Sequence, residues 1–177
     1  MFSPDQLNSL RILRYPDPRI RQPCQCVEDF DASLASLAER MFELMSRAGG
    51  VGLAAAQLGV LVRLFVCNPT GQQEDKQVYV NPRLVGLDGQ VEAEEGCLCL
   101  PGVVAPIRRA ERCTITASDL AGQPIERSAD GLLARIWQHE LDHLEGRLIL
   151  ERMSPASKIA NRRALKQLEA DYHRPIE

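Results

Sequence analysis

The stretch GLLARIWQHELDHLEG, residues 131–146, decides how this chain can fold. Its apolar residues recur at helical spacing, Asp130 can cap the start of a helix, and Gly146 stands where a left-handed glycine ends one. His139 and His143 are four positions apart, so they project from the same face of that helix. Apolar residues flank both histidines, so this face points inward, where an unpartnered histidine pair would be costly.

A hydrolytic metal site is the chemistry that this helix indicates most directly. Two imidazoles at this spacing can bind one ion, and Glu140 lies about 100° further round the helix, within reach of a metal-bound water. Ordinary hydrogen-bonded histidines are the alternative, since H-E-x-x-H arises by chance in on the order of one in a few hundred chains. Asp142 lies off the histidine face, where we expect a carboxylate that pairs with an arginine rather than a ligand.

The rest of the chain has a helix on each side of a strand-rich middle. Prolines make residues 11–24 an irregular lead-in, and residues 31–50 form an apolar helical stripe that Asp31 or Ser33 can cap. Strand-like runs occupy residues 62–68, 77–84, 113–119 and 123–129, with strand and loop pieces in 89–111. A tail helix is expected at about 155–172. This order predicts an α+β fold, with mostly antiparallel sheets around a central metal-binding helix and with N-terminal and C-terminal helices.

Length, composition and charge limit the class of protein. The chain has 177 residues, 45% of them hydrophobic, so residues 1–177 are expected to form one catalytic domain with a full core. A net charge of -3 gives no reason to expect DNA as a partner. Because there is no apolar run of about 18 residues and no secretory or transit pattern, we expect a cytoplasmic protein with no membrane contact.

Several residues are candidates for the third protein ligand of the metal. Ile149 stands where the extended metalloprotease pattern has its third histidine, so that extension fails. Glu169 on the tail helix and His173 near the end of the chain are late candidates. Cys97 and Cys99 offer a thiolate, which with two imidazoles makes a roughly tetrahedral site with an open position. In an extended segment both thiols face the same side, so their spacing alone does not choose between them.

Because the start of the sequence shows no secretory pattern, we expect the six cysteines to be thiols or metal ligands rather than disulfides. The pairs CQC at 24–26 and CLC at 97–99 leave open a four-cysteine zinc site, although C-x-C supports it more weakly than C-x-x-C. A zincin-type peptidase is a second alternative. A third is a non-catalytic module with a metal closed in by four ligands.

Three segments carry a resemblance to a known family. GVGLAAAQ (50–57), EGCLCLP (95–101) and HELDHLEG (139–146) resemble, in order and spacing, the motifs G-x-G-L-A-A-x-Q, E-G-C-L-S and H-E-x-D-H-L-x-G of peptide deformylase. The lead-in LRYPDPRI is similar too, so the resemblance covers most of the chain. It implies that Cys97, His139 and His143 are the metal ligands.

The chain departs from the family at two places. Cys99 replaces the serine that usually follows E-G-C-L. An arginine that helps to hold the site in some members falls near Val104, which leaves Arg108 and Arg109 as candidates to replace it.

The resemblance implies a reaction as well as a fold. The family removes the formyl group from the N-terminal formylmethionine of new polypeptides and releases formate. A divalent ion is implied, Fe²⁺ first and Zn²⁺ or Ni²⁺ as alternatives, whose bound water attacks the formyl carbon while Glu140 acts as general base and acid. Gln57 and the backbone N–H of Leu98 are expected to stabilise the oxyanion. The expected substrate contacts are Gly50, Gly52 and Ile136.

The tail helix has a possible partner of its own. Some members of the family dock a basic C-terminal helix near the ribosomal exit, where formylmethionyl nascent peptides emerge. The basic residues available for RNA phosphates are Lys158, Arg162, Arg163 and Lys166. A solvated helix face is the alternative.

Overall fold

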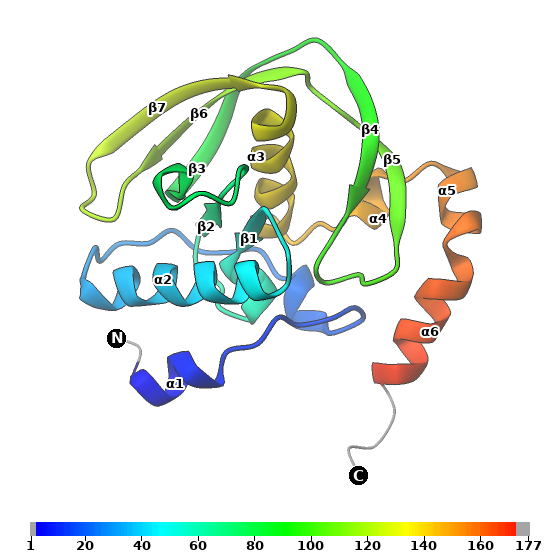
Figure 1. Cartoon of the computed structure of the whole chain (residues 1–177), viewed down its shortest axis with the longest axis horizontal. Helices are drawn as coiled ribbons and strands as arrows, with labels where there is room; N and C mark the ends of the chain where they lie inside the picture. The colour runs from blue at the N-terminus through cyan, green and yellow to red at the C-terminus, as the bar shows by residue number, and fades with distance from the viewer. Residues whose placement is uncertain (1–2, 173–177) are drawn as a thin grey trace.

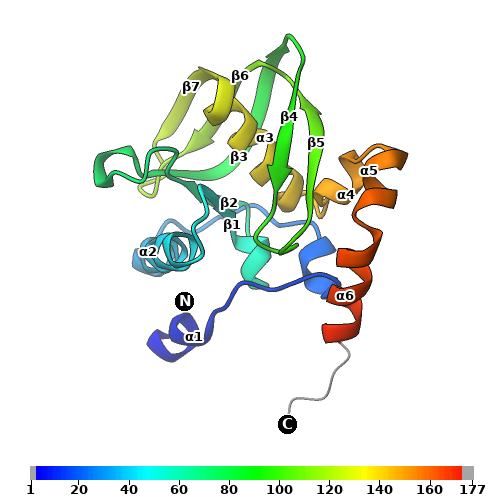
Figure 2. The same cartoon turned by 45° about the vertical axis from the view of Figure 1, so that its right-hand side comes forward.

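The helix with the two histidines, α3 (Gly131–Leu144), lies in the middle of the molecule (Figure 1). The structure is a computed structural model that describes residues 3–172, so His173 lies outside the described residues. A five-stranded sheet and a two-stranded sheet lie on different sides of α3, as a comparison of Figures 1 and 2 shows. The α+β fold with sheets around a central helix is therefore confirmed.

Both sheets are antiparallel. The larger one has the strand order β1-β2-β3-β6-β7. Its strands are β1 (Gly52–Ala54), β2 (Leu64–Cys67), β3 (Gln77–Asp88), β6 (Arg112–Ser118) and β7 (Pro124–Asp130). The smaller sheet pairs β4 (Val91–Gly96) with β5 (Val104–Arg109). All four expected strand runs are present, and β3 extends past residue 84 because Asp88 still pairs with Arg112 of β6.

The strand pattern does not predict β1, which lies inside the run of small residues that follows α2 (Ala32–Arg47). Its three residues pair with Phe65, Val66 and Cys67 of β2. Short, small-residue strands carry almost no periodic signal, so only this pairing reveals them. From Gly52 onward the run is a buried strand followed by a 3₁₀ turn.

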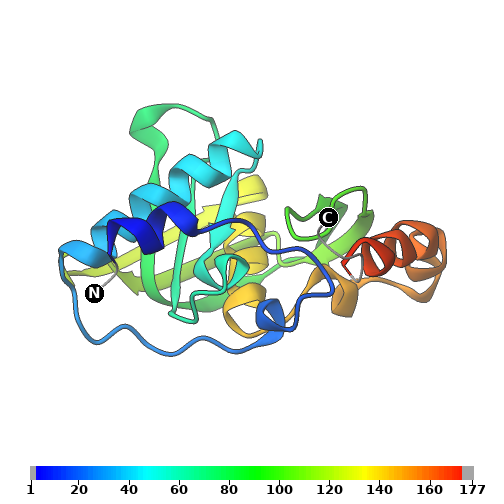
Figure 3. The same cartoon turned by 90° about the horizontal axis from the view of Figure 1, so that it is seen from below.

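The N-terminal helices lie side by side at one end of the molecule (Figure 3). The periodicity does not predict α1 (Pro4–Ser9), which is only six residues long. Asp31 rather than Ser33 caps α2, because its carboxylate accepts hydrogen bonds from the backbone N–H groups of Ser33 and Leu34. The 3₁₀ helices are η1 (Pro18–Arg21), η2 (Ala55–Leu58) and η3 (Gln73–Asp75).

The tail differs from the single helix expected at about 155–172. After α4 (Ile149–Arg152), the chain forms α5 (Pro155–Ala160) and α6 (Arg162–Tyr172), with a break at Asn161. The Asn161 amide donates hydrogen bonds to the carbonyl oxygens of Val104 (2.9 Å) and Ser157 (3.0 Å). An asparagine that bonds to nearby carbonyls competes with helix continuation, and here it also ties the tail to β5.

Alternating side chains of β2 divide the core into two layers. Leu64 and Val66 pack with α2, whereas Phe65 and Cys67 pack with Trp137 of α3. Alternation along a strand sends neighbours to opposite faces, so one sheet buries both helices. A third cluster joins the lead-in, the loop after Cys97, α4 and α6.

Both ends of α3 lie where the sequence places them. Asp130 is the N-cap residue, although its side chain makes no capping hydrogen bond. Gly146 has a positive φ of 72°, as expected for a glycine after a helix. A Cβ there would also lie 2.4 Å from the carbonyl oxygen of Arg21, so only glycine leaves room for the backbone of the lead-in. No helix within residues 3–172 combines the length and the apolar character needed to cross a bilayer.

Candidate active site

Cys97, His139 and His143 come together beside the central helix. One ligand atom from each lies within 4.8 Å of the others, and the Cys97 Sγ is 3.3 Å from the His143 Nε2. In the part of the chain that the structure describes, no other group of three such residues could hold a metal. A sulfur and two imidazole nitrogens are a donor set that suits Zn²⁺ or Fe²⁺.

A turn decides which of the two cysteines joins the histidines. The backbone N–H of Leu100 donates to the Cys97 carbonyl oxygen at 2.9 Å, so the segment is not extended as the spacing argument assumed. Cys99 is 0% exposed and packs in the core cluster with the lead-in and α6. Cys97 is therefore the thiol in the metal-capable group, and Cys99 lies outside it.

The other candidate ligands lie elsewhere. Glu169 accepts a hydrogen bond of 2.8 Å from the Tyr15 hydroxyl, and His173 lies outside the described residues. The cysteines at 24–26 do not join those at 97–99 in any metal-capable group of the described residues. The four-cysteine zinc hypothesis is therefore wrong, because the fold places the two pairs in different surroundings.

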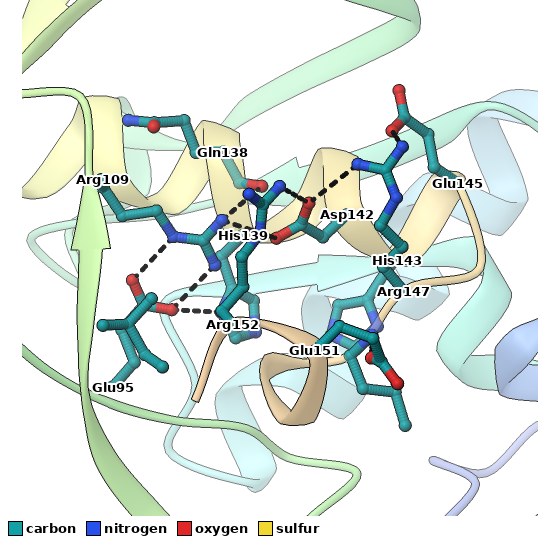
Figure 4. Close-up of polar contacts among 12 residues, drawn as sticks. Glu95, Arg109, Gln138, His139, Asp142, His143, Glu145, Arg147, Glu151 and Arg152 are labelled. Atoms are coloured by element: carbon teal, nitrogen blue, oxygen red, sulfur yellow. Dashed lines mark hydrogen bonds and ion pairs between the residues drawn. The ribbon is translucent and has the colours of Figure 1, made fainter. Parts of the chain in front are cut away.

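Glu95 holds the orientation of His139 (Figure 4). The His139 Nδ1 lies 2.9 Å from one carboxylate oxygen of Glu95, and Arg109 makes two bonds of 3.0 Å to the same carboxylate. Arg135 is a second arginine partner of Glu95, at 2.6 Å. With Nδ1 bonded to Glu95, the His139 Nε2 is left for a metal. Burial raises the pKa of Glu95, but the bonds from His139 and Arg109 outweigh it and hold that pKa well below its usual range.

Asp142 pairs with arginines, as expected, but it is buried. It accepts hydrogen bonds from Arg109 and from two nitrogens of Arg152, at 3.1 and 2.6 Å (Figure 4). Arg109 thus links Glu95 to Asp142, whereas Arg108 is an exposed partner of Glu92. Of the two arginines left open by the sequence, Arg109 supports the site. Sequence reasoning missed this role for Glu95 and Arg135, although Glu95 begins the EGCLCLP segment.

Glu140 is buried against a glycine. Its side chain is 3% exposed, and its Oε2 has no hydrogen-bond partner among the described residues. A Cβ on Gly52 would lie 2.3 Å from the Glu140 Oε1, so only glycine leaves room for this carboxylate. Burial raises the pKa of Glu140 to about 7. This places a carboxylate with an unsatisfied oxygen at the wall of the cleft.

The histidine and thiol groups influence one another. Burial lowers the pKa of His139, but contacts with Cys97 and Glu95 outweigh it, so the net pKa is raised well above its ordinary value. The Cys97 pKa is raised, first by a hydrogen bond with Cys99 and then by burial.

Gln57 is oriented by the backbone of β1. Its Oε1 accepts a hydrogen bond from the Ala54 N–H at 2.7 Å, which turns the Nε2 toward the sulfurs of Cys97 (3.7 Å) and Cys99 (3.5 Å). Leu98 lies opposite Gly50, where a Cβ would come within 2.7 Å of the Leu98 Cδ1. A side chain at Gly50 would therefore have to displace the end of Leu98.

A cleft of about 400 Å³ opens onto this arrangement. Every expected site residue lines it except His143, which is buried behind it. Ile136 forms part of the apolar wall. The cleft brings together the three separate segments that the sequence singles out.

The lead-in supports the site through its backbone, which sequence reasoning missed. The Leu13 N–H donates to the Gln57 carbonyl oxygen and the Tyr15 N–H donates to the Cys99 carbonyl oxygen, each at 2.8 Å. These bonds join the segment LRYPDPRI to both loops of the cleft. The sequence feature that could have indicated this supporting role is the similarity of that segment to the family.

Comparison with known proteins agrees with this geometry. The family model for polypeptide deformylase matches residues 9–158. A peptide deformylase of Chromobacterium violaceum is 43% identical over 160 residues, covering 90% of this chain and 96% of that protein. A crystal structure of a peptide deformylase from Legionella pneumophila has 42% identity and a TM-score of 0.86, and covers 94% of this chain and 100% of its own. One from Plasmodium falciparum has 31% identity and a TM-score of 0.89, covering 93% and 100%.

The chain therefore belongs to the polypeptide deformylase family, and it is an enzyme of that class.

Proposed function

We propose that this chain, as one catalytic domain of residues 1–177, hydrolyses the N-formyl group of formylmethionine at the start of new polypeptides and releases formate. The observation that carries the proposal is the group of Cys97, His139 and His143 beside a cleft that Glu140 also lines. Because the substrates are nascent chains at ribosomes, we place the activity in the cytoplasm.

The metal ligands are Cys97, His139 and His143, and we propose Fe²⁺ as the ion, with Zn²⁺ or Ni²⁺ as alternatives. The residues fit such an ion, because three donors converge and the bond to Glu95 leaves one imidazole nitrogen of His139 free. A bound divalent cation would act as a Lewis acid and lower the pKa of a coordinated water.

Glu140 is the general base and acid of this proposal. Its carboxylate is held against Gly52, with one oxygen unpartnered, so it can accept a proton from a water in the cleft. The same carboxylate can then return the proton to the leaving amine. This use of one group for both steps needs no further acid in the cleft.

Gln57 and Leu98 supply the donors for the developing oxyanion. The Gln57 amide is preorganised by its bond to Ala54, so its N–H bonds need no reorientation. The backbone N–H of Leu98 is the second donor. Gly50, Gly52 and Ile136 are the proposed substrate contacts, since they line the cleft and leave an apolar wall for a methionine side chain.

We also propose that the tail contacts the ribosome. Lys158, Arg162, Arg163 and Lys166 are all exposed, and Ile159 beside them is 75% exposed. Basic side chains around an apolar one suit a surface of RNA phosphates and protein. Co-sedimentation with ribosomes at low and high salt tests this. Binding that survives replacement of all four basic residues by Gln would contradict it.

The test of the reaction is formate release from formyl-Met-Ala-Ser by anaerobically purified, Fe²⁺-loaded protein. Unformylated peptide and a chelated sample are the controls. We expect formate only from the formylated peptide and only with metal. Cleavage at internal peptide bonds would favour the zincin peptidase instead, and an inert, metal-loaded sample would favour the binding module.

A further inference from the structure

The thiol that replaces the family's usual serine lies next to the proposed ligand thiol. The Gln57 Nε2 contacts both sulfurs, at 3.7 Å for Cys97 and 3.5 Å for Cys99. The two sulfurs therefore share the Gln57 amide as a common neighbour.

The backbone between the two cysteines is bent. Leu98 and Cys99 are the middle residues of the turn that the bond from Leu100 N–H to the Cys97 carbonyl oxygen closes. A disulfide needs Cα atoms about 4.4–6.8 Å apart. Two residues separated by one in a turn are drawn inside the upper limit, because the turn shortens the path that an extended chain would span.

The two thiols differ in their access to small molecules. Cys97 lines the cleft, whereas Cys99 is 0% exposed. A small oxidant can therefore reach Cys97 from the cleft, and Cys99 is reached only by way of its neighbour. Cys97 is therefore placed to react with the oxidant, and Cys99 is placed behind it as the resolving thiol.

We propose that Cys97 and Cys99 are a modification site for hydroperoxides, which convert the two thiols into an intramolecular disulfide. The Cys97 thiolate attacks the peroxide, its sulfur bonds to the nearer oxygen, and the O–O bond breaks. With one proton taken up, this yields Cys97–S–OH and water or an alcohol. The Cys99 sulfur then displaces that hydroxyl group as a second water and forms the S–S bond. Two thiols are oxidised by two electrons, and the peroxide is reduced by two.

The disulfide has a consequence for the cleft. A sulfur held in an S–S bond is no longer a thiolate donor, so the group with His139 and His143 loses one of its three ligands. Reduction by a dithiol restores both thiols. This loss of metal rests on the proposed ligand role of Cys97, whereas formation of the disulfide does not.

The pair at 24–26 is an internal control with the same spacing. Gln25 forms a bridge with Val62 through the bonds Gln25 N–H to Leu61 and Arg63 N–H to Gln25, so the chain is extended there. An extended chain holds such a pair about 6.8 Å apart, at the limit for a disulfide. Cys26 is exposed and Cys24 is half-buried, so peroxide reaches this pair without forming the bond.

The experiment treats the reduced, full-length protein, loaded with Zn²⁺ because peroxide does not oxidise that ion, with one equivalent of hydrogen peroxide, then alkylates free thiols and maps the peptides by mass. We expect the peptide with residues 97 and 99 to lose two hydrogens and escape alkylation, and dithiothreitol to reverse both. Metal content, measured after desalting, should fall with the disulfide. Cys26→Ser should behave as the parent protein does.

Cys99→Ser separates this proposal from ordinary oxidation. In that variant Cys97 should collect oxygen atoms that dithiothreitol does not fully remove, with no loss of two hydrogens. Oxygen adducts on Cys97 of the parent protein, or a disulfide first at residues 24 and 26, would overturn the proposal. A disulfide in a protein that never releases formate would support it while refuting the proposed reaction.

Discussion

Residues 24–26 and residues 97–99 each have two cysteines around one residue, yet they lie in different chemical settings. The first pair is in an extended lead-in, where Cys24 N–H bonds to the Leu144 carbonyl oxygen. The second follows β4, turns back on itself and reaches the histidines of α3. The spacing of cysteines thus says little about their chemistry. The backbone shape and the neighbours brought in from elsewhere decide it.

The two pairs should differ most in metal binding when one thiol is removed from each. Cys97→Ser should weaken metal binding by more than the roughly 10- to 100-fold that loss of an outer hydrogen-bond partner costs, since a ligand itself is lost. Cys26→Ser should retain metal and turnover. Metal titration of both variants measures the difference. Equal retention in the two would show that Cys97 is not a ligand.

Glu140→Ala separates metal binding from turnover within the second region. The carboxylate is not in the group of three ligands, so we expect normal metal content. Turnover should fall by about 100- to 10,000-fold, because proton transfer loses its base. Glu126→Ala, an exposed change on β7, is the matched control. Formate release that survives in Glu140→Ala would remove this residue from the proposed mechanism.

Gln25, which lies between the two cysteines of the first pair, is the control position for Gln57. Gln57→Ala should lower turnover by about 100- to 1,000-fold with little change in metal content, since an oxyanion donor is lost. Gln25 is exposed, so Gln25→Ala should change neither quantity. Formate kinetics and metal content of the two variants check this. Normal turnover without the Gln57 amide would exclude it as an oxyanion donor.

The smallest effect is expected where the lead-in meets the tail. Tyr15→Phe removes the hydroxyl bond to Glu169 but keeps the backbone bond to Cys99. The free energy of unfolding should fall by about 0.5–1.5 kcal/mol, the worth of one hydrogen bond, while turnover stays unchanged. Urea unfolding with a parallel activity assay measures both. A large loss of turnover would mean that the tail controls the Cys97 loop.

Much of the fold could be predicted from periodicity alone. The apolar stripe of α2, the four strand runs and the histidine helix all have clear patterns, and each is present. The patterns failed where segments are short or made of small residues, as in α1 and β1. They also failed at Asn161, whose side chain bonds to β5 and breaks the tail into two helices.

The ligand group was predicted as a set through family resemblance, while the residues alone left Cys97 and Cys99 equal. Glu95 and Arg109 lie in segments that the resemblance singled out, but the contacts among Glu95, Arg109 and Arg135 had no local signal, because these residues come from β4, β5 and α3. Charged residues of this kind look like surface positions in a sequence. Their burial is visible only when the elements that carry them are packed together.

The sequence by itself determined the helix that presents His139 and His143 on one face, because helical spacing is a local property of the chain. It also determined membership of the family, through three motifs in order. Only the tertiary structure decided that Cys97 faces the histidines and that Cys99 is buried behind it. That choice depends on a turn closed at Leu100 and on the lead-in segment, whose Tyr15 N–H bonds to the Cys99 carbonyl oxygen; no local pattern records these contacts.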